Sequence, residues 1–330
     1  MKQNQEMKLF ALEPSRLLGE QVAASIGCPL SRHEEREFGG GEHKARPLEE
    51  VGGRDVYVIH GLHGEPGNSA NDKLIRLLFF INTLRDAGAA RVTAIAPYLA
   101  YSRKDRRTKP RDPVSSRYVA ALFDAVGTDR IVTIEVHNVS AFENAFRLCR
   151  PEHIPVAGLF ADQLLARLTD RDVAVVSPDT GGNKRAELFR HELEKRLNRP
   201  AGKAIMDKHR SMGVVSGSLF AGDLAGKTAI IIDDLISSGT TIVRAAKACR
   251  DAGAVGVIAA AAHGMFTNDS PLFGPEGPDR LVVTDTIPLA ADLPDSARAR
   301  IDVVSAASLL GNVITRLHRG EAVSDLIPYD

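Results

Sequence analysis

Strand-like and helix-like segments alternate along almost the whole sequence, and this alternation limits the possible folds more than any other feature. Short apolar runs rich in β-branched residues predict strands at residues 55–60, 90–98, 130–137, 172–178, 226–234 and 255–264. Apolar residues at helical spacing predict helices between them, at residues 71–88, 114–127, 160–168, 182–197 and 241–253. Near-continuous apolar strands between amphipathic helices are typical of an α/β fold whose mostly parallel sheets are flanked by helices.

The chain is long enough for two such sheets. It has 330 residues, and domains of roughly 150 residues are common. The strand and helix pattern starts again near residues 150–160, so we expect an N-terminal domain of residues 1–155 and a C-terminal domain of residues 156–330. The C-terminal tail of the second domain could pack back on the first.

Composition excludes several classes of protein. Lys plus Arg (42) equals Asp plus Glu (42), which favours neither nucleic acid nor a membrane surface as a partner. The three cysteines are far apart and form no CxxC pair, which argues against a disulfide framework and a structural zinc site. The N-terminal residues lack the apolar core of a signal peptide, and no apolar run reaches the ~20 residues that span a bilayer. We therefore expect a cytoplasmic protein.

The segment IIIDDLISSGTT, residues 230–241, carries the strongest chemical signal. An apolar strand leads to two acids and then to small hydroxyl and glycine residues before a helix: Asp233, Asp234, Ser237, Ser238, Gly239, Thr240 and Thr241. Free backbone N–H groups at a helix N-terminus, together with hydroxyl donors, form an anion site that suits a phosphate. A helix N-cap is the alternative explanation, but it accounts for one hydroxyl and not for four.

The two acids need a different partner, because carboxylates close to a phosphate repel it. A metal ion or the vicinal hydroxyls of a sugar would satisfy them. A sugar phosphate fits both halves of the segment, with its phosphate in the loop and its hydroxyls on Asp233 and Asp234.

Residues 102–112, SRKDRRTKPRD, contain six basic residues directly after a predicted strand. A solvated charged loop is the usual meaning of such a run, and nucleic-acid binding is the next. The segment has no aromatic residue to stack on bases, and the chain has no net positive charge. Its position after a strand end favours a triphosphate, to which arginine makes bidentate contacts.

Two further strand ends and one later segment carry candidate residues. His137 and Asp179 each follow an apolar strand, and together they could hold Mg²⁺, which takes few protein ligands and keeps phosphate and water oxygens. Lys208 and Arg210 precede a segment with four glycines. They could lie on a mobile loop that closes over a substrate or on a surface hairpin.

Taken together, these segments resemble the ribose-phosphate pyrophosphokinase (PRPP synthetase) family over residues 7–326. The resemblance rests on FGGGE, SRKDRR, EVHN, SPDTGG, DKHR, IDDLISSGTT and the closing VVSAASLLGNVITRLHRGEAVSDL, in this order. Ser237 and Thr240 stand where common bacterial members have an acid and a glycine, so this loop is also similar to that of phosphoribosyltransferases.

The resemblance implies two tandem phosphoribosyltransferase-like domains and transfer of the β,γ-diphosphoryl group of Mg-ATP to the 1-hydroxyl of ribose 5-phosphate, which gives PRPP and AMP. It implies that Phe38 and Glu42 contact adenine from a neighbouring subunit of a homodimer or hexamer. It implies further roles for Arg103 and Lys104 on ATP, for His137 and Asp179 at the Mg²⁺ site, and for Lys208 and Arg210 over the transferring group. Asp179, Asp233, Asp234 and residues 237–241 would bind ribose 5-phosphate.

Three other functions compete with this one. A phosphoribosyltransferase would use PRPP and leave the first domain without a ligand. A non-catalytic regulatory homologue typically loses the metal and basic-loop residues, and this chain keeps His137, Asp179, Lys208 and Arg210. A related kinase that acts on another sugar phosphate is also compatible with the sequence.

Overall fold

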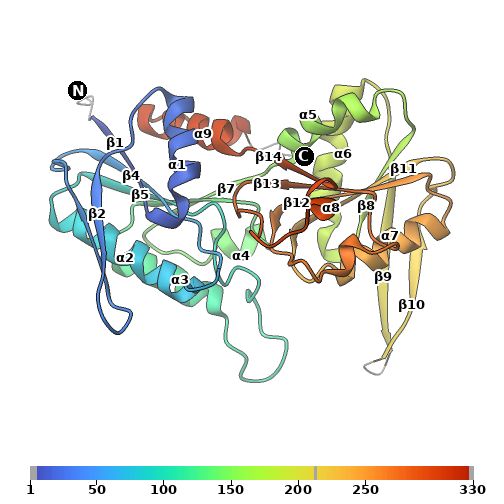
Figure 1. The fold of residues 1–330 in the computed structure, drawn as a ribbon, viewed down its shortest axis with the longest axis horizontal. Coiled ribbons are helices and arrows are strands. Elements are labelled where there is room, and N and C mark those ends of the chain that lie inside the picture. Colours follow the sequence, from blue (N-terminus) through green and yellow to red (C-terminus); the bar gives the residue numbers. More distant parts are fainter. Residues whose placement is uncertain (1–5, 212–213, 327–330) are drawn as a thin grey trace. The chain divides into compact units, whose positions relative to one another are not determined.

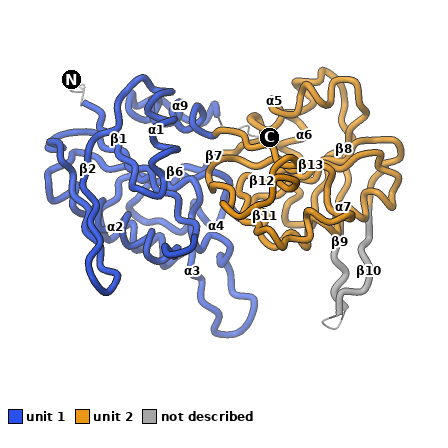
Figure 2. Tube along the Cα trace, in the orientation of Figure 1, with its two compact units in different colours: residues 1–154, 306–327 blue, residues 155–305, 328–330 orange. Residues whose placement is uncertain are grey.

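The computed structural model describes residues 6–211 and 214–326, and for residues 207–220 it describes the backbone alone. The chain divides into two compact units, shown in different colours in Figure 2. Unit 1 comprises residues 1–154 and 306–327, and unit 2 comprises residues 155–305 and 328–330. The chain therefore crosses from one unit to the other after Ile154 and returns to unit 1 at Ala306.

Unit 1 is built on a parallel sheet of five strands in the order β1-β4-β5-β6-β7. Figure 1 shows α2 and α3 on one face of this sheet and α1 and α9 on the other. The strands are β1 (Met7–Ala11), β4 (Asp55–Ile59), β5 (Arg91–Ile95), β6 (Arg130–Ile134) and β7 (Arg150–Ile154), and β2 (His33–Glu37) and β3 (His43–Pro47) form a separate antiparallel hairpin. The helices are α1 (Arg16–Ile26), α2 (Ala70–Asp86), α3 (Ser115–Ala125), α4 (Val139–Glu143) and α9 (Ala307–Arg319), with short 3₁₀ turns at Glu13–Ser15 and Ser324–Leu326.

The C-terminal helix α9 is fastened to unit 1 by close packing and by buried charge. A side chain at Gly311 would overlap Ser25 of α1, since its Cβ would lie 2.1 Å from the Ser25 hydroxyl oxygen. At the other end of α9, His318 lies 2.7 Å from the carboxylate of Asp55, the first residue of β4 and fully buried. Arg91 also donates to this carboxylate. The contacts of Gly311 with Ser25 and of His318 with Asp55 each join residues more than 200 positions apart in the sequence.

Unit 2 is built on a sheet of seven strands in the order β10-β9-β8-β11-β12-β13-β14, in which only the β9–β10 pair is antiparallel. The strands are β8 (Val173–Ser177), β9 (Gly202–Ser211), β10 (Val214–Ala221), β11 (Thr228–Ile236), β12 (Gly256–Gly264), β13 (Arg280–Thr284) and β14 (Ile301–Val304). The helices are α5 (Ala157–Leu168), α6 (Asn183–Leu197), α7 (Thr240–Asp251) and α8 (Asp295–Arg298), with 3₁₀ turns at Thr180–Gly182 and Pro271–Phe273.

The prediction of an α/β fold with mostly parallel sheets flanked by helices is confirmed. The central strands are apolar on both faces because both faces are covered: every residue of β4 and β8 is buried. Three predicted strand ends differ from the structure by two residues or more. β5 stops at Ile95, although the strand was predicted to continue to residue 98. β6 stops at Ile134 because Glu135 has a φ of 39°, whereas β11 continues to Ile236 and contains both acids. None of the helices in the described ranges is long and apolar enough to cross a membrane.

Candidate functional site

The order of strands in unit 2 reverses direction between β8 and β11. The chain runs from β8 to β9 on one side of β8, and β11 pairs on the other side. Open α/β sheets bind ligands beyond the carboxyl ends of the strands at such a point. Pairing between β8 and β11 ends at Val176 and Ile231, so Asp233 and Asp234 extend beyond the end of β8. Asp179 follows β8 at the same edge of the sheet.

The acid pair faces Arg185 on the helix after β8. Nη1 of Arg185, in the first turn of α6, lies 3.8 Å from Oδ1 of Asp233 and 3.5 Å from Oδ1 of Asp234. The three side chains are between 8% and 20% exposed. The Asp233 carboxylate also accepts the backbone N–H of Asp234 at 2.9 Å.

This arrangement shifts the ionisation of the pair. Burial, together with the neighbouring Asp234 carboxylate, raises the pKa of Asp233 to about 8, and the positive charge of Arg185 acts in the opposite direction. Without a ligand, Asp233 therefore keeps its proton near neutral pH. A bound metal ion, or hydroxyl groups that donate to the carboxylates, would favour the ionised form.

The residues after β11 form a tight turn that leads directly into α7. Gly239 has a φ of 82° and precedes the first helical residue, and no side chain caps this end of the helix. The first N–H groups of a helix have no partner within it and attract anions. Ser237, Ser238 and Thr240 are exposed around this N-terminus, and Thr241 is half-buried. The hydroxyls of Ser238 and Thr240 are 2.7 Å apart and hydrogen-bonded.

A second segment of unit 2 holds this turn in place. Ser270 donates its hydroxyl to the backbone carbonyl of Ser238 at 3.0 Å. Leu272 packs so closely on Gly239 that a Cβ there would lie 2.3 Å from Cγ of the leucine. Only glycine fits at position 239, for two reasons: the positive φ and the lack of space.

Asp179 occupies the start of the short 3₁₀ turn that precedes α6. Its carboxylate accepts the backbone N–H of Gly182 at 3.1 Å, and its backbone carbonyl accepts the hydroxyl of Ser177 at 2.6 Å. The side chain is half-buried at the carboxyl end of β8. It is thus a carboxylate of fixed orientation on the edge that carries the acid pair.

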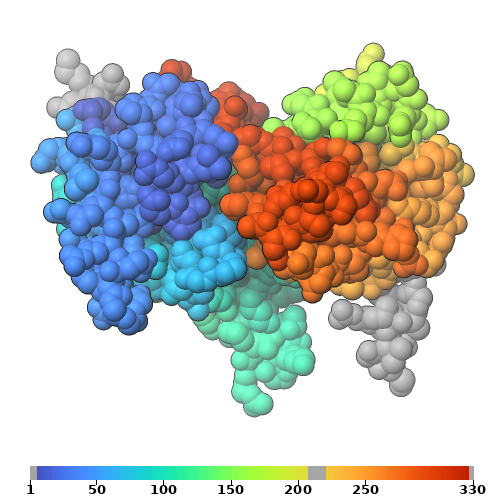
Figure 3. Space-filling view, in the orientation of Figure 1, coloured from blue at the N-terminus to red at the C-terminus, as the bar shows by residue number. Residues whose placement is uncertain are grey.

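In unit 1, the basic segment forms a long loop between β5 and α3, which projects from the surface of the unit in Figure 3. One oxygen of Asp112 organises it. Oδ2 accepts from the Lys104 ammonium at 2.7 Å, from the Thr108 hydroxyl at 2.7 Å, and from the backbone N–H groups of Thr108 and Lys109, both at 3.0 Å. These donors hold the pKa of Asp112 well below its usual range, with Lys104 as the largest cause.

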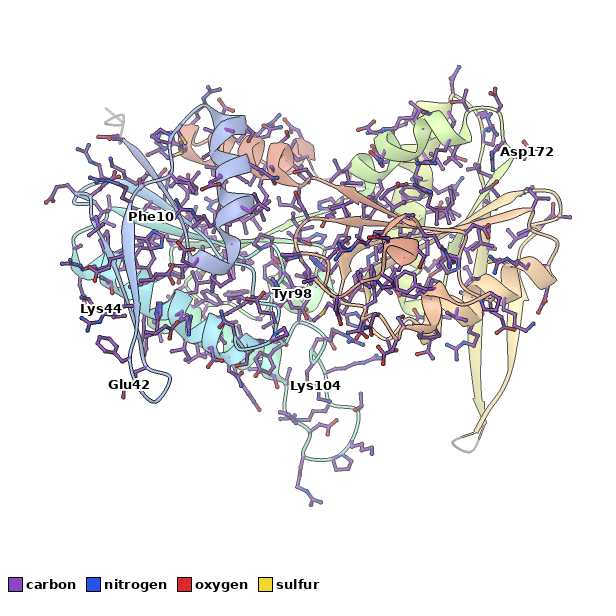
Figure 4. The ribbon with its side chains drawn as sticks, viewed as in Figure 1. Phe10, Glu42, Lys44, Tyr98, Lys104 and Asp172 are labelled. Carbon is purple, nitrogen blue, oxygen red and sulfur yellow. The ribbon has the colours of Figure 1, made fainter. Side chains whose placement is uncertain are left out.

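The other predicted residues of unit 1 lie on the loop, on a neighbouring strand end and on the hairpin. Arg103 is exposed on the loop, and Figure 4 labels the neighbouring Lys104. His137 is exposed just after β6, beside Asn138, which donates to Asp105 of the loop at 2.7 Å.

The hairpin β2–β3 carries the remaining two predicted residues at its tip. The backbone N–H of Phe38 donates to the carbonyl of Glu42 at 2.8 Å, and the Arg36 guanidinium lies 5.1 Å from the Phe38 ring centroid. Phe38 is 41% exposed. Figure 4 shows Glu42 near this tip. Both residues are therefore open to a ligand or to another chain.

Two predictions fall on residues whose side chains are not described. Lys208 and Arg210 lie on β9, where their backbones pair with Ser218 and Val215 of β10. The backbone of this segment is thus a β-hairpin, and the roles predicted for the two side chains stay predictions. The same holds for the predicted metal site, because His137 belongs to unit 1 and Asp179 to unit 2. Within the described ranges, no three His, Cys, Asp or Glu residues are grouped as a metal site.

The sequence did not single out Arg185, Asp112, Ser270 or Leu272. Arg185 lies six positions after Asp179, in the first turn of the next helix. A basic residue at this distance from an acid at a strand end was the signal that the sequence offered. Nothing in the sequence relates residues 270–272 to Gly239, because the contact arises only when the chain folds.

Two family models match the chain. The N-terminal domain of ribose phosphate pyrophosphokinase matches residues 7–127, and the phosphoribosyl synthetase-associated domain matches residues 200–328. The first covers the hairpin and the basic loop, and the second covers the acid pair and the turn before α7.

Curated relatives align along nearly the whole chain. The ribose-phosphate pyrophosphokinase of Caldanaerobacter subterraneus subsp. tengcongensis is 36% identical, and the ribose-phosphate pyrophosphokinase 1 of Streptococcus pneumoniae is 34% identical, each over 97% of this chain and 97% of the relative. Among solved structures, phosphoribosylpyrophosphate synthetase from Mycobacterium smegmatis is similar with a TM-score of 0.84 and 32% identity, over 96% of this chain and 100% of that one.

Proposed function

Because this chain belongs to the ribose-phosphate pyrophosphokinase family, we propose that it transfers the β,γ-diphosphoryl group of Mg-ATP to the 1-hydroxyl of ribose 5-phosphate, giving PRPP and AMP. The observation that carries the proposal is the acid pair of β11 directly before an uncapped helix N-terminus, at the point where the sheet of unit 2 reverses direction. Carboxylates and an anion site within a few residues suit the two ends of one sugar phosphate.

In this proposal, unit 2 binds ribose 5-phosphate. The phosphate accepts hydrogen bonds from the first N–H groups of α7 and from Ser238, Thr240 and Thr241. The ribose hydroxyls donate to Asp233 and Asp234, which orients the sugar and leaves its 1-hydroxyl for the reaction. Ser237 and Gly239 supply the turn between the two parts of the site.

Unit 1 binds ATP. Arg103 and Lys104 lie on the projecting loop and donate to its phosphate oxygens, and Phe38 and Glu42 contact the adenine of a neighbouring subunit. Lys208 and Arg210 of β9 neutralise charge on the diphosphoryl group as it moves. Diphosphoryl transfer depends on positioning and charge stabilisation more than on covalent help from the protein, so cationic groups matter most.

The residues on the edge of unit 2 fit a magnesium ion. Asp179 offers carboxylate oxygen, the ligand that Mg²⁺ prefers. The ion would neutralise phosphate oxygens of ATP. The assignment of His137 to the same ion rests on the family resemblance alone.

Two features of the whole protein complete the proposal. We propose a homo-oligomer, a dimer or a hexamer, because the exposed tip of the hairpin serves a neighbouring subunit in this scheme. We also propose a cytoplasmic location, because the three cysteines are free thiols and form no disulfide bond in the described residues. Cys149 and Cys249 are buried.

Product analysis tests the proposal and separates it from its alternatives. The protein is incubated with ATP and ribose 5-phosphate, and AMP, ADP and PRPP are quantified; we expect AMP and PRPP in equal amounts and no ADP. A second incubation offers PRPP with nucleobases, and a third replaces ribose 5-phosphate with other pentose and hexose phosphates. Pyrophosphate release from PRPP and a base would instead identify a phosphoribosyltransferase. Ligand binding without turnover would identify a regulatory homologue, and a faster reaction with another sugar phosphate would change the substrate.

A further inference from the structure

The turn that leads into α7 is held from outside by the segment between β12 and β13, residues 265–279. We propose that Ser270 of this segment is a positioning residue for the phosphate of the substrate. Its hydroxyl orients the peptide group between Ser238 and Gly239 so that the Gly239 N–H donates to the phosphate, and Ser270 itself does not contact the substrate. The proposal rests on the assignment of ribose 5-phosphate to unit 2 and deepens it by naming a residue that shapes the anion site.

The hydrogen bond from Ser270 fixes the orientation of one peptide group in the turn. The Ser270 hydroxyl donates to the carbonyl oxygen of Ser238 at 3.0 Å. A trans peptide group is planar, with its carbonyl and its N–H on opposite sides, and the described residues contain no cis peptide bond. The N–H of Gly239 therefore points away from Ser270. Among the described residues this N–H has no hydrogen-bond partner, so it is available to a ligand.

The Gly239 N–H adds a donor to those at the start of α7. Gly239 directly precedes the first helical residue, Thr240, and no side chain caps this end of the helix. N–H groups of a turn and of the first turn of a helix together form a concave anion site. If the peptide group were turned over, the Ser238 carbonyl oxygen would take the place of this donor and repel a phosphate. The Ser270 hydroxyl opposes this change because it would lose its acceptor.

Ser270 can orient the turn because its own segment is fixed by other contacts. Arg300, directly before β14, donates to the backbone carbonyls of Phe273 at 2.8 Å and of Leu272 at 3.3 Å. The segment also folds closely back on itself, since a Cβ at Gly277 would lie 1.9 Å from the carbonyl oxygen of Leu272. Leu272 is fully buried, and Ser270 is 9% exposed. The turn before α7 is therefore shaped against a rigid neighbour.

The same segment also contacts the other end of α7. Arg250, in the last turn of the helix, donates to the backbone carbonyls of Glu276 at 3.0 Å and of Gly277 at 2.7 Å. It also donates to the Asp279 carboxylate at 2.7 Å. Residues 270–279 thus hold α7 near both of its ends, and they set the position of the helix as well as the orientation of its first donors.

A second role of Ser270 is compatible with this one. Ser270 caps the 3₁₀ turn Pro271–Phe273, because its hydroxyl oxygen accepts the N–H of Leu272 at 3.4 Å. That contact uses a lone pair of the oxygen, and a hydroxyl has one proton to donate as well. The cap therefore leaves the proton for Ser238, and a variant that keeps the hydroxyl should keep both contacts.

The test compares Ser270→Ala with Ser270→Thr, which keeps the hydroxyl, and with Thr169→Ala. Thr169, at the C-terminal end of α5, donates its hydroxyl to the Leu165 carbonyl at 2.9 Å, so this control removes a bond of the same kind. We expect Ser270→Ala to raise KM for ribose 5-phosphate about three- to tenfold, the range for one hydrogen bond. Its kcat should stay within about twofold, because the phosphate is held equally before and during the reaction. KM for ATP should also stay within about twofold, and Thr169→Ala should change none of the three values.

Thermal unfolding is measured in parallel, because the loss of a buried hydrogen bond also lowers stability. Ser270→Thr should keep KM for ribose 5-phosphate within about twofold of the wild type. If Ser270→Ala does not fold, Ser270→Cys replaces it; a thiol donates only weakly, so KM should rise about two- to fivefold.

Three results would overturn the proposal: an unchanged KM for ribose 5-phosphate in a folded alanine or cysteine variant, a fall in kcat at unchanged KM, or an equal rise in KM for ATP. If the wild-type protein forms no AMP and PRPP, the proposed function fails. If it forms both and the Ser270 variants behave like the wild type, the role of Ser270 alone fails.

Discussion

The loop after β11 and the loop after β5 both join the carboxyl end of a parallel strand to a helix, but they are stabilised in different ways. The first spans residues 237–239, where Leu272 packs on Gly239 and the half-buried Arg185 faces the acids. The second spans residues 96–114, and a single half-buried carboxylate, Asp112, gathers its donors. One site is fixed by the sheet and the core, and the other by exposed hydrogen bonds.

Sheet topology accounts for this difference. The strand order of unit 2 reverses between β8 and β11, which leaves room for a ligand at the strand ends without a long loop. In unit 1, the order β1-β4-β5-β6-β7 follows the chain in one direction. Unit 1 therefore relies on a projecting loop for its basic groups. A substitution of the same kind should therefore change substrate binding and stability more in unit 2 than in unit 1.

The largest effect is expected from Asp233→Asn. It removes a charged acceptor from the ribose hydroxyls, so kcat/KM for ribose 5-phosphate should fall about a hundredfold, the upper range for a hydrogen bond to a charged group. KM for ATP should change little. Steady-state kinetics with each substrate varied in turn measures both. A variant with normal kcat/KM for ribose 5-phosphate would remove the acid pair from the sugar site.

The second effect is expected from Gly239→Ala. A Cβ there would lie 2.3 Å from the Leu272 side chain, and the residue has a φ of 82°. We expect loss of about 1–3 kcal/mol of unfolding free energy and about a tenfold higher KM for ribose 5-phosphate. Gly226→Ala is the matched control, because Gly226 has a φ of 71° but nothing lies within 4 Å of the position that its Cβ would occupy. Equal losses in the two variants would mean that packing by Leu272 does not define the loop.

The third effect concerns the dependence of stability on pH. Asp233 has a folded-state pKa of about 8, above that of an unfolded aspartate near ~4. Its contribution to stability is therefore complete below pH ~4 and is lost as pH rises through about 8. At pH 9, Asp233→Asn should have a free energy of unfolding several kcal/mol higher than that of the wild type and should unfold at a higher temperature, and the difference should be much smaller near pH 5. Thermal unfolding without ligands checks this, and a gain that is the same at both pH values would contradict it.

The smallest effect is expected in unit 1, from Asp112→Asn. The substitution weakens the contacts that shape the loop, so KM for ATP should rise about two- to fivefold, while unfolding free energy should stay within ~0.5 kcal/mol, as for most surface changes. KM for ribose 5-phosphate should stay the same. Asp223→Asn, which breaks an exposed pair with Lys227 in unit 2, is the control. A loss of stability or a large rise in KM for ribose 5-phosphate would show that the two loops are not built differently.

Much of this site could be predicted from the sequence because it is local. The acid pair, the hydroxyls and Gly239 follow one another within residues 233–241, and the alternation of strands and helices predicts that they lie at the edge of a sheet. Arg185 was missed because its relation to the acids depends on β8 and β11 being neighbours. The end of β6 was predicted three residues too late, since the apolar run continues past Glu135, where the backbone turns away from the strand.

The return of α9 to unit 1 illustrates the same limit on a larger scale. Ser25 and His318 contact partners more than 200 residues away in the chain, through packing on Gly311 and ion pairing with Asp55. Apolar residues at helical spacing give α9 a buried face, but this spacing does not indicate which unit covers that face.

The central claim is that the two loops bind different ligands, and equilibrium binding to two loop variants tests it most directly. Calorimetric titration of ribose 5-phosphate and of a non-hydrolysable ATP analogue with magnesium is carried out on the wild type, Arg103→Ala and Ser238→Ala. Arg103→Ala should weaken the ATP analogue about tenfold and leave ribose 5-phosphate unchanged, and Ser238→Ala should do the reverse with a several-fold loss. Weakening of the same ligand by both substitutions, or an exchange of the two effects, would contradict the account.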